Sequence, residues 1–193
     1  MQPLVASASR ASDVVKQAKQ SVVSIDYKPI LTAYSIPLEG GATGVVVDKQ
    51  EGYLLTNGMI GEPTIAEYTV SFFNGTKAKA KICYSDPWLN FSILKLDPAI
   101  IPTEALAVKI SEQEPIEGEA IFTITIPEEK RTQRILSKGR VSDINFVKVV
   151  RMPEHLIDIS MDTNDGGVGS LVFNQKGEGI ALINFKRQRT LHW

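Results

Sequence analysis

One stretch of the sequence, GATGVVVDKQEGYLLTNGMI at residues 41–60, decides the expected fold. Its three consecutive valines and its Tyr-Leu-Leu-Thr run are typical of two strands, because β-branched and aromatic residues fit the pleated surface of a sheet. The Lys-Gln-Glu-Gly segment between them supplies a turn. The stretch therefore predicts a β-hairpin that ends in a loop at Asn57-Gly58 and places Met59 just beyond it.

Short segments with a strand pattern recur along the chain, separated by turn-forming residues. They cover residues 21–25, 68–73, 76–82, 91–96, 106–110, 120–126, 134–150, 156–161, 170–173 and 179–184. Asn74-Gly75 is the strongest short hairpin signal, and the Lys-Ala alternation after it is typical of an exposed edge strand. Segment 27–38 carries two prolines and is expected to be irregular. Many short strands with few helices predict an all-β fold.

The first 20 residues are rich in Ser and Ala and differ from the rest of the chain. One interpretation is a presequence, because three basic residues stand against a single acid. We favour a short helix that packs beside the first strand, with Ser12 as its N-cap and Asp13 in its first turn.

The composition bounds the function. Hydrophobic residues make up 43% of the 193 residues, which is enough for a packed core. The net charge of −1 gives no support for nucleic-acid binding, which needs a basic face. Cys83 is the only cysteine, so no internal disulfide and no cysteine-based zinc site is expected, and an intracellular, reducing compartment fits. No apolar run approaches the length of a membrane helix.

Four stretches, in order, resemble the protease domain of HtrA/Deg-type serine proteases. They are residues 42–57, 86–98, 166–174 and 176–180. The Ala-Thr-Gly at 42–44 and the Lys-Leu-Asp-Pro at 95–98 resemble most the tandem HtrA-like proteases of fungi and plants. The resemblance implies two antiparallel six-stranded β-barrels of the trypsin type, over residues 21–100 and 101–193, after a helix or arm over residues 1–20.

The resemblance also implies where a catalytic triad would lie. The histidine of the family falls on Met59, its aspartate on Asn90 and its serine on Val168. None of these side chains can exchange a proton with a serine hydroxyl, and a triad acts as one unit, so its loss removes most of the rate. We therefore expect Met59 and Val168 to lie close together as a buried apolar pair between the barrels.

Two alternatives keep an enzymatic activity open. One is a serine hydrolase that uses Ser170 or Ser160 with His155, although Ser170 lies past the expected nucleophile turn. The other is a regulatory subunit that is activated in trans. His192 adjoins the chain end, and a surface role is favoured for both histidines.

Two further patterns are weak. Residues 162–166 resemble a calcium loop, but their glycine comes one position early and Phe173 replaces the closing glutamate. The basic run at 186–189 is more typical of a solvated chain end than of an RNA site. No metal and no cofactor is expected.

We therefore expect a pseudoprotease: a catalytically inactive domain that binds protein partners or acts as a scaffold within a larger assembly. A third alternative is a peptide-binding module that retains the substrate groove. The residues of that candidate groove are Gly166, Gly167, Val168, Gly169 and Ser170.

Overall fold

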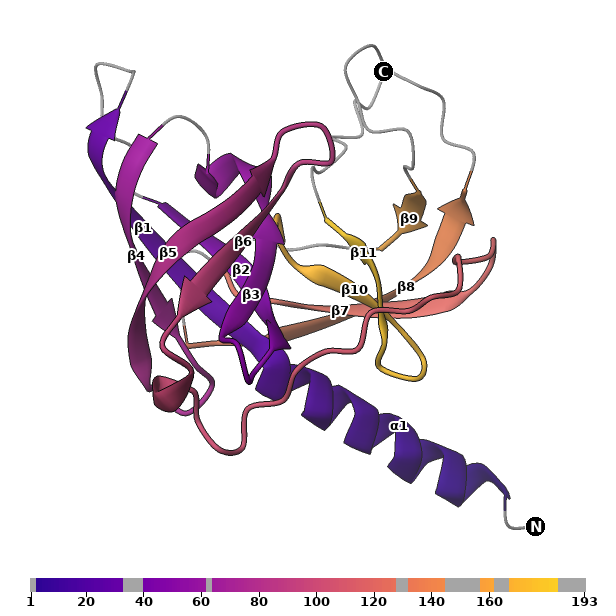
Figure 1. The fold of residues 1–193 in the computed structure, drawn as a ribbon. Coiled ribbons are helices and arrows are strands. Elements are labelled where there is room, and N and C mark those ends of the chain that lie inside the picture. Colours follow the sequence, from indigo (N-terminus) through magenta and orange to yellow (C-terminus); the bar gives the residue numbers. More distant parts are fainter. Residues whose placement is uncertain are drawn as a thin grey trace.

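The computed structural model describes residues 3–32, 40–61, 64–127, 132–144, 157–161 and 167–183. Figure 1 shows two β-units side by side and a helix that projects from their junction. His155, His192, Gly166, the calcium-like segment 162–166 and the basic run 186–189 lie outside the described residues.

The first unit is a closed antiparallel barrel of six strands. Its strands are β1 (Val22–Thr32), β2 (Gly40–Asp48), β3 (Tyr53–Asn57), β4 (Thr64–Ser71), β5 (Lys77–Asp86) and β6 (Phe91–Leu96), in the order β1-β2-β3-β6-β5-β4. The predicted hairpin of the opening stretch is confirmed, because β2 and β3 pair in antiparallel register with Val45 opposite Leu55.

The valine run in β2 packs on both of its faces. Val46 and Leu54 point into the barrel core, where they join Leu94, and all three are fully buried. Val45 and Leu55 point the other way and pack into the core of the second unit. A strand that is covered on both faces reads as a continuous apolar run instead of an alternating one. β2 and β3 therefore form the wall through which the two units contact each other.

The second unit is a five-stranded antiparallel sheet in the described part of the chain. Its strands are β7 (Ala120–Thr125), β8 (Ile135–Asp143), β9 (Asp158–Ser160), β10 (Leu171–Asn174) and β11 (Gly179–Leu182), in the order β11-β10-β7-β8-β9. These described strands form a half-barrel, and the expected all-β fold of two antiparallel units after a short N-terminal helix is confirmed. The rings of Phe122 and Phe173 stack at 5.1 Å in its core.

The connection between the units differs from the expectation. No strand forms over residues 106–110, because this segment is tied down by single hydrogen bonds instead of a ladder. The amide of Val108 donates to the carbonyl of Val46 at 2.8 Å. Ile110 forms one isolated parallel bridge with Gly179. The segment thus links the two units without extending either sheet.

The N-terminal helix α1 (Pro3–Ser21) is confirmed, but it is longer than expected. It begins at Pro3, so the prediction that Ser12 caps it is wrong, and proline suits the first turn of a helix because its missing N–H needs no partner there. Its last turns pack Ala18 and Val14 into the core of the second unit. No helix within the described ranges is long and apolar enough to cross a membrane.

Two other strand predictions are wrong for identifiable reasons. The segment expected to be irregular from Tyr27 continues β1 to Thr32, because a bulge between Pro29 and Leu31 accommodates the proline. β5 is not an edge strand, since it pairs with β4 on one side and β6 on the other. Its lysines alternate because the outer face of the barrel is solvated.

Candidate functional site

The loop after β3 holds the first predicted site residue. Asn57 is buried, and its side-chain oxygen accepts a hydrogen bond from the backbone N–H of Met59 at 2.8 Å. This bond caps the short 3-10 helix η1 (Gly58–Gly61) and fixes the position of Met59 on it. Met59 is 62% exposed. The expectation of a buried apolar pair is therefore wrong for Met59, because its turn projects outward from the barrel rim.

The second predicted residue, Asn90, lies against this turn. The amide of Gly58 donates to the carbonyl of Asn90 at 2.9 Å. A Cβ atom on Gly58 would stand 2.7 Å from Oδ1 of Asn90 and 2.9 Å from its carbonyl carbon. The β6 end of the barrel and η1 thus fit together only because position 58 has no side chain.

Asn90 has a backbone φ of 54°, a left-handed conformation that asparagine tolerates better than most residues. It ends a turn that Asp86 organises: Oδ1 of Asp86 accepts from the amides of Trp88 at 2.9 Å and Leu89 at 2.8 Å. The hydroxyl of Tyr84 donates to Oδ2 at 3.2 Å. The amide of Leu89, followed by those of Trp88 and the Tyr84 hydroxyl, lowers the pKa of the Asp86 carboxyl. Three hydrogen bonds to one carboxylate therefore hold this turn together.

The third predicted residue, Val168, lies at the tip of a tight turn. The amide of Ser170 donates to the carbonyl of Gly167 at 3.0 Å, which closes the turn around Val168 and Gly169. Gly169 has a φ of 85°, as the third position of a type II turn requires. Val168 is partly buried, whereas Gly167, Gly169 and Ser170 are buried.

The turn at 167–170 rests on the ends of β2 and β3. A Cβ atom on Gly169 would stand 2.5 Å from the carbonyl oxygen of Thr43, 2.9 Å from Oγ1 of Thr56 and 3.3 Å from the amide nitrogen of Asn57. Asn57 therefore contacts both other loops, since its side-chain amide also reaches the carbonyl of Asn90 at 3.4 Å. The structure brings the three predicted positions together around Asn57.

The chemistry available at this point is limited. A thioether, a neutral amide and an isopropyl group offer no side chain that titrates near neutral pH. Ser170 follows Val168 by two residues, but it is 0% exposed and its hydroxyl oxygen has no hydrogen-bond partner among the described residues. Ser160 is exposed at the end of β9. No group of three or more His, Cys, Asp or Glu residues suited to a metal ion occurs in the described ranges.

The sequence analysis missed two residues at this site, Trp88 and Leu89. These residues are 78% and 47% exposed, and they precede Asn90, whose carbonyl accepts from the amide of Gly58 next to Met59. The Asp-Pro-Trp run that begins at Asp86 was a usable signal. An aspartate commonly starts a turn by accepting hydrogen bonds from the amides two and three residues further on, as Asp86 does here. Together with Met59, these two exposed apolar residues give the rim a hydrophobic character.

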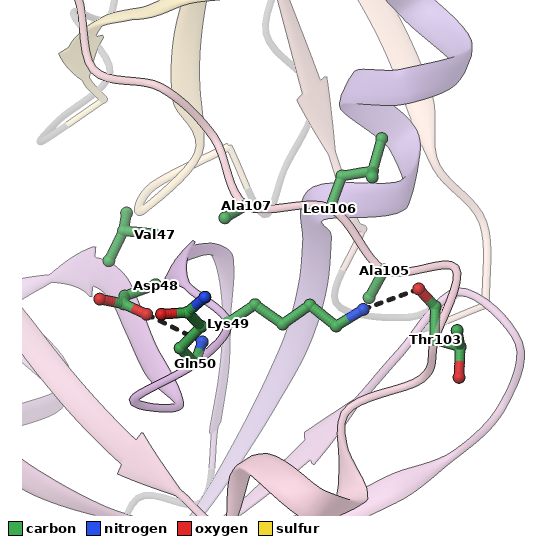
Figure 2. Close-up of a pocket in the computed structure, with 8 residues that line it drawn as sticks. All are labelled: Val47, Asp48, Lys49, Gln50, Thr103, Ala105, Leu106 and Ala107. Atoms are coloured by element: carbon green, nitrogen blue, oxygen red, sulfur yellow. Dashed lines mark hydrogen bonds between the residues drawn. The ribbon is translucent and has the colours of Figure 1, made fainter.

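A separate hollow of about 610 Å³ lies at the other end of the β2–β3 hairpin. Figure 2 shows its eight lining residues, with the ammonium of Lys49 donating to the carbonyl of Thr103 at 2.7 Å. Asp48 is also engaged, since its Oδ1 accepts from the amide of Gln50 at 2.8 Å. Both charged side chains that line the hollow are thus hydrogen-bonded to backbone groups.

A closed antiparallel barrel, a second antiparallel sheet and three loops that meet at their junction define the two-barrel class of trypsin-type proteins. The family described as "Trypsin-like peptidase domain" matches residues 42–182. The chain therefore belongs to this family, and its resemblance to HtrA-like proteases is confirmed.

Relatives and solved structures agree with this assignment. The pro-apoptotic serine protease NMA111 of Chaetomium globosum is 35% identical over 100 residues, which are 49% of this chain and 10% of that protein. The protein of the same name from Saccharomyces cerevisiae is 22% identical over 156 residues, which are 78% of this chain and 15% of that protein. The chain thus aligns with about a tenth to a seventh of the length of these fungal relatives.

Two solved structures share the fold. The HtrA-type protease AlgW with tripeptide matches with a TM-score of 0.74 and 19% identity, over 89% of this chain and 53% of that one. The serine endoprotease from Yersinia pestis matches with a TM-score of 0.69 and 20% identity, over 89% of this chain and 56% of that one.

Proposed function

We propose that this trypsin-like domain is a catalytically inactive pseudoprotease that works by binding protein partners, as an interaction or scaffold domain. One observation carries the proposal. The three loops that meet around Asn57 present Met59, Asn90 and Val168, and none of these side chains can accept, hold or deliver a proton in an acyl transfer.

The rim of the site supports the binding part of the proposal. Met59, Trp88 and Leu89 are 62%, 78% and 47% exposed on neighbouring turns. Exposed tryptophan is enriched among residues that dominate protein–protein affinity. Asp86 and Asn57 hold these turns in place by hydrogen bonds. Binding a partner would therefore cost little conformational entropy of the turns, because they are already fixed.

Two of the three alternatives, the hydrolase and the peptide-binding module, are less well supported. A hydrolase that uses Ser170 would need its hydroxyl to reach a substrate, and this side chain is fully buried. A peptide groove along residues 166–170 would need accessible backbone, and Gly167, Gly169 and Ser170 are buried against the first barrel. Ser160 is the exposed serine that an enzymatic alternative would have to use.

Labelling with a fluorophosphonate tests the inactive state. We expect no adduct in the intact mass of the protein, whereas trypsin treated in parallel is labelled stoichiometrically. The matched variants Ser160→Ala and Ser170→Ala locate any adduct that forms. A stoichiometric adduct that Ser160→Ala or Ser170→Ala abolishes would overturn the proposal and establish the enzymatic alternative.

A further inference from the structure

β5 carries a basic stripe on the outer wall of the barrel, formed by Lys77, Lys79 and Lys81. These three side chains are exposed, while Ala78 and Ala80 between them are buried in the barrel core. Figure 1 shows β5 between β4 and β6, and the wall that contacts the second unit is made by other strands. The lysines therefore face solvent in one row.

The spacing of this row is regular. Residues two apart on an antiparallel strand point to the same face, and each residue advances the strand by about 3.4 Å. The lysine side chains thus emerge about 6.8 Å apart. A second extended chain lying along the stripe would present its own alternate side chains with the same repeat.

The positive charge of the stripe is poorly compensated within the barrel. Lys81 lies directly opposite Lys95 on β6, and like charges in such pairs destabilise a sheet. Lys95 turns away, since its ammonium lies 3.4 Å from Oε2 of Glu51 and 4.8 Å from the centre of the Tyr53 ring. Among the described residues, no ion pair involves Lys77 or Lys81.

The one internal partner of the stripe is weakly held. Lys79 pairs with Glu67 on β4 at 3.0 Å, but the two side chains are 70% and 56% exposed. An ion pair this exposed contributes little to stability, so a carboxylate from outside can replace Glu67 at small cost. The whole row is therefore available to an acidic ligand.

The shape of the stripe favours a peptide over a nucleic acid. Glu67 on β4 and Glu51, which pairs with Lys95 on β6, lie at its two borders, so the cations without a firm partner form a single row that an extended chain can follow. Its cations are all lysines, without the forked arginine that phosphate recognition favours. β5 is paired on both sides, so binding must come from side chains instead of strand addition.

We propose that the stripe Lys77-Lys79-Lys81 binds an extended acidic segment of a partner protein that carries carboxylates at every second residue. This surface does not involve the loops around Asn57, so it stands whether or not the domain is catalytically inactive. Its failure in a binding experiment leaves the proposed inactive state untouched.

Fluorescence anisotropy with a labelled peptide of about ten residues, alternating Glu and Thr, tests the surface. We expect binding at low ionic strength that weakens as salt is added. The variant K77A/K79A/K81A should weaken it by about tenfold, the sum expected for three exposed ion pairs. The matched control K16A/K138A/K176A removes the same charge from exposed lysines elsewhere and should leave the affinity unchanged.

Two further arms keep the test decisive. A peptide of the same composition with its glutamates in one block should bind several-fold more weakly, because only alternation matches the row. The reversed variant K77E/K79E/K81E should bind a Lys-Thr peptide instead. The proposal is overturned if both triple alanine variants lose affinity equally, if the block peptide binds as well, or if a single-stranded oligonucleotide binds more tightly than the Glu-Thr peptide.

Discussion

The backbone of Gly58 is hydrogen-bonded to Asn90, with the glycine amide 2.9 Å from the asparagine carbonyl. This contact ties the loop after β3 to the end of the β5–β6 turn. It explains why a glycine precedes Met59, because any Cβ atom at position 58 would stand within 3.0 Å of Asn90 and of the Phe91 amide.

Gly58→Ala should therefore destabilise the domain by about 1–3 kcal/mol, the usual cost of overpacking. Urea unfolding measures the change. A double-mutant cycle adds Asn90→Gly, which removes the Oδ1 atom that the new Cβ atom at position 58 would clash with. Because glycine adopts a positive φ without strain, this second substitution should restore part of the stability that Gly58→Ala loses. Equal stability of Gly58→Ala and wild type would show that the two loops are not in this contact.

Gly169→Ala should cost more. Its φ of 85° is unfavourable for alanine by about 1–2 kcal/mol, and the new methyl group would press on the carbonyl of Thr43 at 2.5 Å. With overpacking added, a loss of about 2–5 kcal/mol is expected in the free energy of unfolding. Gly75→Ala is the matched control, since Gly75 also has a positive φ (87°) but faces open space. Equal losses at the two positions would contradict the packing of the 167–170 turn on β2 and β3.

The turn that displays Trp88 should loosen in acid. The pKa of Asp86 is lowered below the ordinary value of 3.8 by hydrogen bonds from the Leu89 and Trp88 amides and the Tyr84 hydroxyl. A depressed pKa means that the stabilisation is present above the pKa of the unfolded state and is lost as the pH falls through the folded pKa.

Tryptophan fluorescence in a Trp193→Phe background reports this transition, because Trp88 is then the only tryptophan. Asp86→Asn still accepts both amide bonds but does not titrate, so its signal should stay flat over the same acidic range. A transition of the same size and midpoint in both proteins would show that another group causes it.

The fold was predictable from the sequence because its signals are local. The valine run at 45–47 and the Asn74-Gly75 turn each specify a hairpin through residues that are adjacent in sequence. The extension of β1 past Pro29 was not predictable, because a bulge and pairing with a distant strand override a local strand breaker. The edge assignment of β5 failed for a similar reason, since barrel closure is not encoded within the strand.

The candidate site was predictable only in part. The order of four motifs located Met59, Asn90 and Val168, and the loops that carry them do meet around Asn57. The exposure of Met59 was missed, because hydrophobicity alone predicts burial and the outward direction of η1 depends on the Asn57 cap. Trp88 was overlooked because its exposure depends on the turn that Asp86 stabilises by hydrogen bonds, and the sequence pattern alone does not show that turn.

Restoring the three side-chain types should not restore proteolysis. In M59H/N90D/V168S, the existing loops would still set the orientation of each new side chain, and these loops are not arranged to align an imidazole with a hydroxyl. A misplacement of about an ångström costs about two orders of magnitude in rate. Cleavage of an unstructured substrate should stay at background. The melting temperature should fall modestly, because Val168 is partly buried and Asn90 has a left-handed backbone, whereas position 59 is largely exposed. Rapid cleavage by this variant would mean that the site is still arranged for catalysis.

Turnover of casein by the unmodified chain tests the central claim most directly. The triple variant M59A/N90A/V168A serves as the matched control, because it truncates the three side chains carried by the loops that meet around Asn57. We predict that neither protein cleaves casein faster than the buffer control does, at protein concentrations at which trypsin digests the substrate completely. Cleavage by the unmodified chain that the triple variant abolishes would contradict the account and show that these loops form a working active site.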